Sequence, residues 1–154
     1  MRLRDVRLRA LGDAPDAFGA TLRQESEYDG GAWRRLGSMG AWWVACDGGT
    51  DVGVIAGGHH DDARVRWVYS MWVDEAHRGT GVAALLLDEV VRWARGEGVA
   101  TLGLDVADRV PRARSFYERY GFVANGRVAP MPRDASILLA EMHLGLGDLA
   151  GSPP

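Results

Sequence analysis

The segment of residues 65–98 constrains the fold most strongly, because it joins a long apolar strand to an amphipathic helix through a glycine-containing loop. Residues 65–73 are rich in β-branched and aromatic side chains, which is typical of a strand. From Val82 onward, apolar side chains recur at the spacing of one helix face, and Gly96 and Gly98 end that pattern. A strand that leads into such a helix predicts a domain in which helices pack on a sheet.

The flanking segments supply further elements by the same periodicities. Upstream, we expect a helix over residues 2–11 and a second helical stretch that runs past Phe18 and Leu22 until Gly30 and Gly31 interrupt it. The other apolar patterns predict strands over residues 41–46, 52–58, 99–106, 122–128 and 137–144, and a helix over residues 111–120. The order predicts helices, an antiparallel meander, and then strand–helix–strand–helix–strand. This is a mixed α/β or α+β sheet domain.

The length of 154 residues suits one domain with a core of its own. We expect that domain to span residues 1–144 and residues 145–154 to form a flexible tail. The single cysteine, Cys46, rules out an internal disulfide and a cysteine-rich zinc site, and we expect it to be buried. The longest strictly apolar run is too short to span a membrane, and the N-terminus lacks the apolar stretch of a signal peptide. The expectation is therefore a cytoplasmic protein.

All 18 basic residues of the chain are arginines, and this bias excludes several kinds of chemistry. Without lysine there is no phosphate loop ending in Gly-Lys-Ser/Thr, no Schiff base to pyridoxal phosphate and no lysine general base. The formal charge of −3 argues against a nucleic-acid binder, which usually carries a basic excess.

The loop between the strand and the helix has the composition of an anion site. Gly79 and Gly81 expose backbone N–H groups at a helix N-terminus, and Arg78 adds a fixed positive charge. The alternative is a tight turn with an arginine in solvent. The loop also fits the dinucleotide pattern G-x-G-x-x-G/A loosely, with Asp105 as its acidic residue, but residues 74–78 separate the strand from the first glycine. A nicotinamide or flavin site is therefore disfavoured.

Two motifs in the second half of the chain carry a family resemblance. Residues 78–83, Arg-Gly-Thr-Gly-Val-Ala, resemble the R/Q-x-x-G-x-G/A signature of the GNAT superfamily of N-acyltransferases, and an apolar strand ending at residue 74 precedes them. Residues 113–122 are similar to the A-x-x-F/L-Y-x-x-x-G-F segment of the same family. The resemblance covers residues 41–144 well and the first 40 residues loosely.

The resemblance implies a mixed, mostly antiparallel sheet flanked by helices, with a splayed central pair formed by strands 65–73 and 99–106. It implies that acetyl-CoA binds as co-substrate in the notch between these strands, and that no metal takes part. Backbone groups of Met71, Trp72 and Val73 would pair with pantetheine. The pyrophosphate would lie on the loop formed by Arg78, Gly79, Thr80, Gly81, Val82 and Ala83. Tyr117 would protonate the departing thiolate; the alternative is a core aromatic residue. Tyr120 is expected to pack near Gly121 and Phe122.

The chain departs from the family pattern in two places. Val110 occupies the position where the family often has an asparagine, so one polar contact to the pantetheine region is expected to be missing or supplied elsewhere. Family members also usually open with a strand, whereas this chain opens within the first helix. Either the edge strand is absent or the true start lies upstream. An exposed sheet edge would favour a homodimer.

Several further side chains have open roles. Glu25 and Glu27 are candidates for the base that deprotonates the amine, against the simpler expectation of a solvated helix face. Tyr69 and Ser70 are candidates for guiding water.

Other candidates lie outside the two motifs. His77 is expected either to contact phosphate or to lie in solvent. Residues 59–62, His-His-Asp-Asp, fit a polar hairpin turn better than a metal site. Trp33, Trp43 and Trp72 are candidates for the wall of the acceptor site.

The sequence thus predicts an acetyl-CoA-dependent N-acetyltransferase that transfers acetyl directly, in a ternary complex, to a primary amine of a small molecule or a peptide N-terminus. Neither nucleic acid nor a membrane is expected as a partner. The alternative is a domain of the same fold that binds CoA without catalysis, as a sensor or partner module. The identity of the acceptor stays open.

Overall fold

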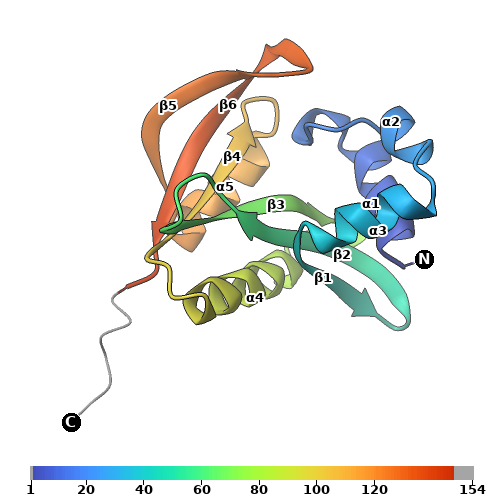
Figure 1. The fold of residues 1–154 in the computed structure, drawn as a ribbon, viewed down its shortest axis with the longest axis horizontal. Coiled ribbons are helices and arrows are strands. Elements are labelled where there is room, and N and C mark those ends of the chain that lie inside the picture. Colours follow the sequence, from blue (N-terminus) through green and yellow to red (C-terminus); the bar gives the residue numbers. More distant parts are fainter. Residues whose placement is uncertain (1, 148–154) are drawn as a thin grey trace.

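The computed structural model describes residues 2–147, which form a single sheet flanked by helices (Figure 1). The strands of the sheet follow the order β1-β2-β3-β4-β6-β5. Their bounds are Gly40–Asp47 (β1), Thr50–His59 (β2), Val65–Val73 (β3), Thr101–Ala107 (β4), Val123–Met131 (β5) and Asp134–Gly145 (β6). Neighbouring strands run antiparallel except β3 and β4, which are parallel. The mixed, mostly antiparallel sheet predicted from the sequence is confirmed.

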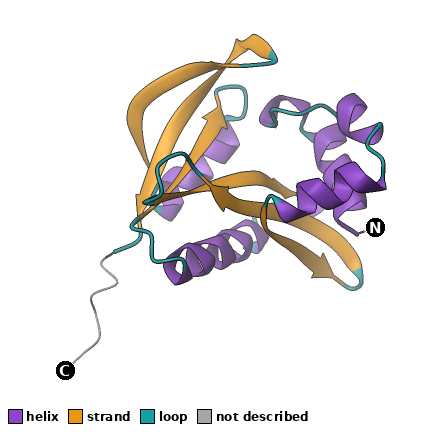
Figure 2. Ribbon diagram, in the orientation of Figure 1, coloured by secondary structure: helices purple, strands orange, loops and turns teal. Residues whose placement is uncertain are grey.

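Helices cover the sheet on both faces (Figure 2). Their bounds are Arg2–Asp13 (α1), Leu22–Ser26 (α2), Gly30–Ser38 (α3), Val82–Gly96 (α4) and Pro111–Tyr120 (α5), with short 3-10 turns at Pro15–Ala17 (η1) and Glu75–His77 (η2). Adjacent residues of β2 show the two faces, because Ile55 packs with α4 and Val54 packs with α1. Both side chains are fully buried.

The larger core lies between the sheet and helices α4 and α5. Leu87 and Val90 of α4 are fully buried against Leu102 of β4 and Met142 of β6. The apolar face of α4 that the sequence shows is therefore the face that meets the sheet. This packing holds the N-terminus of α4 at a fixed place beside the end of β3.

The central strands separate after a short parallel stretch. β3 and β4 pair only at Val65 with Thr101, Arg66 with Leu102, and Trp67 with Gly103. The register of β2 against β3 shifts between Val54 and Ala56, which places a bulge in β3. Beyond Trp67, β4 continues along β6 while β3 turns away from it. The splayed strand pair implied by the family resemblance is present.

The first 40 residues differ from the expected boundaries. The helical stretch predicted past Phe18 and Leu22 is wrong, because the chain forms the short turn η1 and then extends to Thr21, which caps α2 through a reciprocal bond with Gln24. Glycines 30 and 31 do not interrupt a helix. They form the first turn of α3, whose N–H groups are capped by the Asp29 carboxylate.

The ends of the described chain bear on two further expectations. No strand precedes α1 in residues 2–147, and β1 forms one edge of the sheet. At the other end, the tail expected from residue 145 lies mostly outside the described residues, which stop at 147. Leu146 is buried and donates its N–H to the carbonyl of Ala100, so packing continues at least that far. No helix within the described residues is both long and apolar enough to cross a membrane.

Candidate active site

The splay between β3 and β4 leaves a small cavity of about 70 Å³. Three elements supply the lining residues that matter most for its chemistry: Ser70 and Met71 from β3, Asp105 and Val106 from β4, and Tyr117 from α5. Phe18, which follows η1, closes the cavity on another side. The cavity therefore lies in the notch between the two strands to which the family resemblance assigns acetyl-CoA.

Tyr117 is both a core residue and a cavity residue. Its side chain packs against Phe116 and Phe122 with ring centroids 5.5 and 5.6 Å apart, and only 7% of the residue is exposed. Its hydroxyl makes no hydrogen bond within residues 2–147, yet the residue lines the cavity. Burial raises the pKa of this phenol above its usual value, so it stays protonated at neutral pH and can act as a donor.

The loop between β3 and α4 presents bare backbone. Gly79 and Gly81 adopt φ values of 75° and 93°, in the left-handed region that favours glycine. A Cβ built on either glycine meets no atom within 4 Å, so the backbone faces open space. Helix α4 begins at Val82 with Gly81 as its N-cap, and no side chain of the described residues caps it. The first N–H groups of α4 are thus available to an anion.

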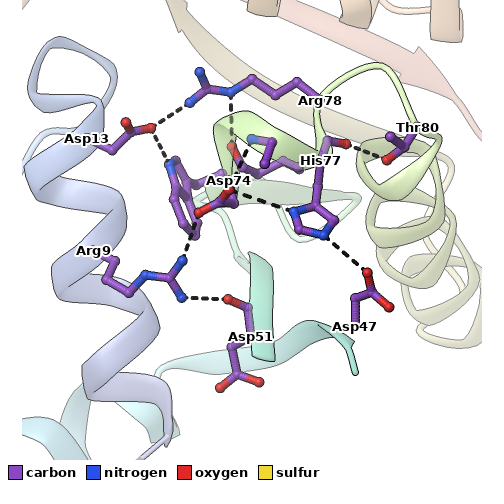
Figure 3. A network of polar contacts seen from close by, with 11 residues as sticks. Arg9, Asp13, Asp47, Asp51, Asp74, His77, Arg78 and Thr80 are labelled. Carbon is purple, nitrogen blue, oxygen red and sulfur yellow. Dashed lines mark hydrogen bonds and ion pairs between the residues drawn. The ribbon is translucent and has the colours of Figure 1, made fainter. Parts of the chain in front are cut away.

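The side chain of Arg78 is directed toward α1 (Figure 3). Its Nη2 atom lies 2.5 Å from Oδ2 of Asp13, and its Nε atom donates to the carbonyl of Val73 at 3.0 Å. The same Asp13 oxygen accepts the indole N–H of Trp72 at 2.8 Å. Thr80 bonds through its hydroxyl to the carbonyl of His77. In this conformation Arg78 braces the loop between β3 and α1 and already has partners.

His77 faces two carboxylates in the same network. Its Nε2 atom lies 3.2 Å from Asp47 and its Nδ1 atom lies 3.7 Å from Asp74 (Figure 3). Asp74 also accepts from Arg9 at 2.8 Å. The N–H of Ala76, with help from Arg9 and His77, lowers the pKa of the Asp74 carboxyl. His77 is therefore partly buried and contacts Asp47 in this structure.

Comparison with known proteins decides the family. Residues 9–122 match the model of the Acetyltransferase (GNAT) family. The chain belongs to this family. The GNAT resemblance inferred from the two motifs is confirmed. The match also extends into the N-terminal helices, which contain neither motif.

Relatives and solved structures agree with this assignment. Probable N-acetyltransferase family 8 member 5 of Mus musculus is 30% identical over 96 residues, which cover 60% of this chain and 42% of the relative. The match thus spans less than half the length of that protein. A GNAT-family protein from Desulfovibrio desulfuricans superposes with a TM-score of 0.75 at 19% identity, over 95% of this chain and 94% of the other. An aminoglycoside 6′-N-acetyltransferase complexed with coenzyme A gives a TM-score of 0.66 at 15% identity, over 91% of both chains.

The GNAT cavity contains one acidic residue that the sequence reasoning did not assign to this site. Asp105 lines the cavity and lies directly across from Glu141 in the register of β4 and β6. Partial desolvation raises the pKa of the Asp105 carboxyl, and the negative charge of Glu141 raises it further. A carboxylate with a raised pKa is a suitable proton acceptor. The signal in the sequence was an aspartate within an otherwise apolar strand, where a charged side chain is unusual.

The glutamates proposed as bases from the sequence lie elsewhere. Glu25 is neither solvated nor free, since only 2% of the residue is exposed and both carboxylate oxygens accept from Arg7, at 2.8 and 2.9 Å. Glu27 is exposed and lies 3.9 Å from Arg23. The structure therefore assigns neither glutamate to the cavity, and Glu25 instead forms a buried ion pair beside it.

The remaining aromatic and metal candidates do not converge on the GNAT cavity. Trp33 packs against Tyr28, Trp43 packs against Trp93, and Trp72 is held by α1, and none of the three lines the cavity. In residues 59–62, His60 stacks on Trp67 at 4.6 Å. No group of three or more potential metal ligands occurs within the described residues.

Two other expectations concern single side chains. Cys46 is exposed, so its predicted burial is wrong. It lies near the end of edge strand β1, where the register against β2 shifts. Tyr120 packs near Phe122 as expected, with ring centroids 6.1 Å apart, and its hydroxyl donates to Asp88 at 2.6 Å.

Proposed function

We propose that this chain is an N-acetyltransferase that moves an acetyl group from acetyl-CoA to a primary amine, on a small molecule or at a peptide N-terminus, within a ternary complex. We also propose that residues 1–144 act as one catalytic domain. The observation that carries the proposal is the cavity in the β3–β4 splay. Tyr117 lines this cavity, and its hydroxyl has no partner in residues 2–147. The N-terminus of α4, which no side chain of the described residues caps, follows β3 in the chain.

The residues around the notch fit acetyl-CoA as substrate. The N–H groups of the loop from Gly79 to Ala83 would bind the pyrophosphate, because open space lies in front of both glycines and no side chain of the described residues caps α4. Met71, Trp72 and Val73 follow the point where β3 leaves β4, so the backbone edge that faces away from β2 would pair with pantetheine, apart from the carbonyl of Val73, which accepts from Arg78. Arg78 would act by bracing this loop. The solved aminoglycoside acetyltransferase with coenzyme A supports this kind of ligand.

Three groups of this chain would divide the chemistry of acetyl transfer. Asp105 accepts a proton from the ammonium form of the amine, which frees the nitrogen lone pair for attack. A backbone N–H between Met71 and Val73 donates to the thioester oxygen as negative charge develops there. As the new C–N bond forms and the C–S bond breaks, Tyr117 donates its proton to the departing sulfur. The second proton lost by the nitrogen returns to the tyrosine through solvent, and Asp105 releases the first proton to bulk water, so the protein ends in its starting state.

Two measurements test the proposal. Calorimetry should detect acetyl-CoA binding and no binding of NADH, and a panel of amines should then release free thiol from acetyl-CoA. Absence of acetyl-CoA binding would refute both the enzyme and its alternative.

The alternative is a non-catalytic CoA sensor or partner domain, and Val110 favours it. This residue is the N-cap of α5 and provides no side-chain hydrogen bond. Tight binding of acetyl-CoA without thiol release by any amine would decide for the sensor.

A further inference from the structure

A buried ion pair connects three elements beside the cavity. Arg7 of α1 donates through Nε and Nη2 to both carboxylate oxygens of Glu25 on α2, at 2.9 and 2.8 Å. Its remaining terminal nitrogen, Nη1, donates to the hydroxyl oxygen of Ser70 on β3 at 2.9 Å. Arg7 and Glu25 are 6% and 2% exposed. The guanidinium also lies 4.9 Å from the ring centroid of Phe18, which lines the cavity.

Ser70 is the place where the backbone of β3 is strained. Its φ of 60° makes it the one non-glycine residue with positive φ in residues 2–147. Such a conformation is unfavourable for a serine and persists only where surrounding contacts hold it. Ser70 lies between Tyr69, the last residue of one run of β2–β3 pairing, and Met71, after which pairing resumes at Trp72. It therefore sets the direction in which β3 leaves β4.

The ion pair is a costly way to fill this space if packing is its only role. Removing two charges from water carries a desolvation penalty that their attraction often fails to exceed, and apolar side chains of similar size commonly serve as well. Apolar side chains cannot donate the third bond that Arg7 makes to Ser70. The planar guanidinium can hold a carboxylate with one edge while a further N–H points elsewhere.

We propose that the Arg7–Glu25 pair is a positioning device for the transfer reaction. Glu25 orients the guanidinium, the guanidinium holds the Ser70 hydroxyl, and Ser70 fixes the bulge that presents the backbone N–H of Met71 to the cavity. Arg7 and Glu25 are positioning residues, because they act through Ser70. The inference rests on the proposed function for its catalytic consequence, and on the geometry alone for the order of the bulge.

Substitutions of Ser70 separate two effects, the strained backbone conformation of the bulge and the hydrogen bond that ties it to Arg7. Ser70→Gly removes both the tether and the strain. Relief of the strain stabilises the fold and loss of the buried hydrogen bond destabilises it, so its melting temperature should stay within a few degrees of the wild type. Its kcat should nevertheless fall about tenfold, because a hydrogen bond to a charged group is lost. The dissociation constant for acetyl-CoA should stay within about twofold, since the pyrophosphate loop is untouched. A glycine variant with wild-type kcat would overturn the proposal, because a merely structural serine predicts no loss.

Arg7→Lys tests the need for a guanidinium. An ammonium is a point charge and cannot reproduce the paired bond to Glu25 together with the bond to Ser70. We therefore expect its kcat, measured per folded enzyme, to fall as far as that of Ser70→Gly, and full rescue by lysine would refute the mechanism. Arg23→Met is the matched control, because it removes an exposed pair with Glu27 on the same helix α2 and should leave kcat unchanged.

Hydrogen exchange provides a readout that needs no acceptor. In Ser70→Ala, which keeps the strain and loses the tether, the amides of residues 69–72 should exchange about tenfold faster than in the wild type, and in Arg23→Met they should not. If the wild type transfers no acetyl group, the proposed function fails while this measurement still tests the positioning role. Unchanged exchange in Ser70→Ala would overturn the role of the ion pair, whatever the enzyme does with amines.

Discussion

Replacing Asp105 by asparagine should make the protein more stable and less active at the same time. The carboxylate faces Glu141 directly across the ladder between β4 and β6, while it lines the cavity where the amine would bind. Like charges directly opposite one another in a sheet repel. The Asp105→Asn variant would keep the shape of the side chain and remove the charge, so one substitution relieves the repulsion and deletes the proposed base.

The size of the stability gain follows from the register and the exposure. A cross-strand pair contributes about 0.2–1 kcal/mol, and because Asp105 is solvent-accessible the gain should lie in the lower half of that range. For a chain of this length that corresponds to roughly 1–2 °C in Tm. Asp16→Asn is the control, since the side chain of Asp16 is half exposed and its ion-pair partner, Arg109, lies 3.9 Å away. It should bring no gain.

The pH dependence of stability predicts independently that Asp105→Asn stabilises the protein. Because the folded-state pKa of Asp105 is raised, the folded protein binds this proton more tightly than the unfolded chain. The loss of stability caused by the Asp105 charge is absent below the pKa of aspartate in the unfolded chain, about 3.9. It develops as pH rises through the pKa of Asp105 in the folded protein, and it is complete above that pKa. The advantage of Asp105→Asn should therefore be full at pH 7 and vanish in strong acid. Thermal unfolding across pH, followed by circular dichroism, measures it.

Activity should move in the opposite direction. Loss of a general base lowers kcat by roughly a hundredfold or more, and the wild type should lose kcat/KM as pH falls through the raised pKa. Glu141→Gln should shift this acidic limb to lower pH, because it removes a charge that raises the pKa of Asp105. If Asp105→Asn retains wild-type kcat with saturating amine, Asp105 is not the base. If it is destabilised at pH 7, the repulsion argument is wrong.

Four other substitutions test the rest of the site. Tyr117→Phe should slow turnover about a hundredfold with acetyl-CoA affinity nearly unchanged by calorimetry, because only the proton donor is lost. Arg78→Ala and Asp13→Asn should both weaken acetyl-CoA binding in calorimetry if Arg78 braces the loop through Asp13, whereas a direct phosphate contact predicts loss in Arg78→Ala alone. Gly81→Ala should lower the free energy of unfolding, measured with urea, by about 1–2 kcal/mol, because the new Cβ meets no atom within 4 Å and only the φ of 93° opposes it.

Local signals were sufficient for the elements that build the notch. β3 and α5 have the predicted bounds, because a run of bulky apolar residues defines one, and Pro111 and Gly121 mark the ends of the other. The same holds for the loop, where two glycines adopt the positive φ values that a sharp turn into a helix requires. Each of these features depends on residues close in sequence.

Features that depend on distant partners were not predictable in the same way. The sequence predicts Glu25 as a solvated helix residue, because no neighbouring residue indicates that it pairs with Arg7, a buried arginine 18 positions earlier. Arg78 is predicted as a phosphate ligand from its neighbours in sequence, whereas the carboxylate that it contacts in the fold, Asp13, is 65 positions away. The role of Asp105 depends on Glu141, which comes into register only when β6 folds back along β4. In each case the chemistry of a charge is set by a partner that the fold supplies.

These long-range contacts have one element in common, which is α1. Arg7 holds Ser70 where β3 leaves β4, and Asp13 holds Arg78 just beyond the end of β3. Arg7 and Asp13 are six residues apart on α1, a distance of about 9 Å along the helix, so this one helix contacts both ends of the splayed half of β3. Arg9 lies between them and binds Asp74. The N-terminal region, where the sequence resembles the family least, thus holds the splayed half of β3 in place, and a substitution of Arg7 or Asp13 should alter catalysis although neither residue lines the cavity.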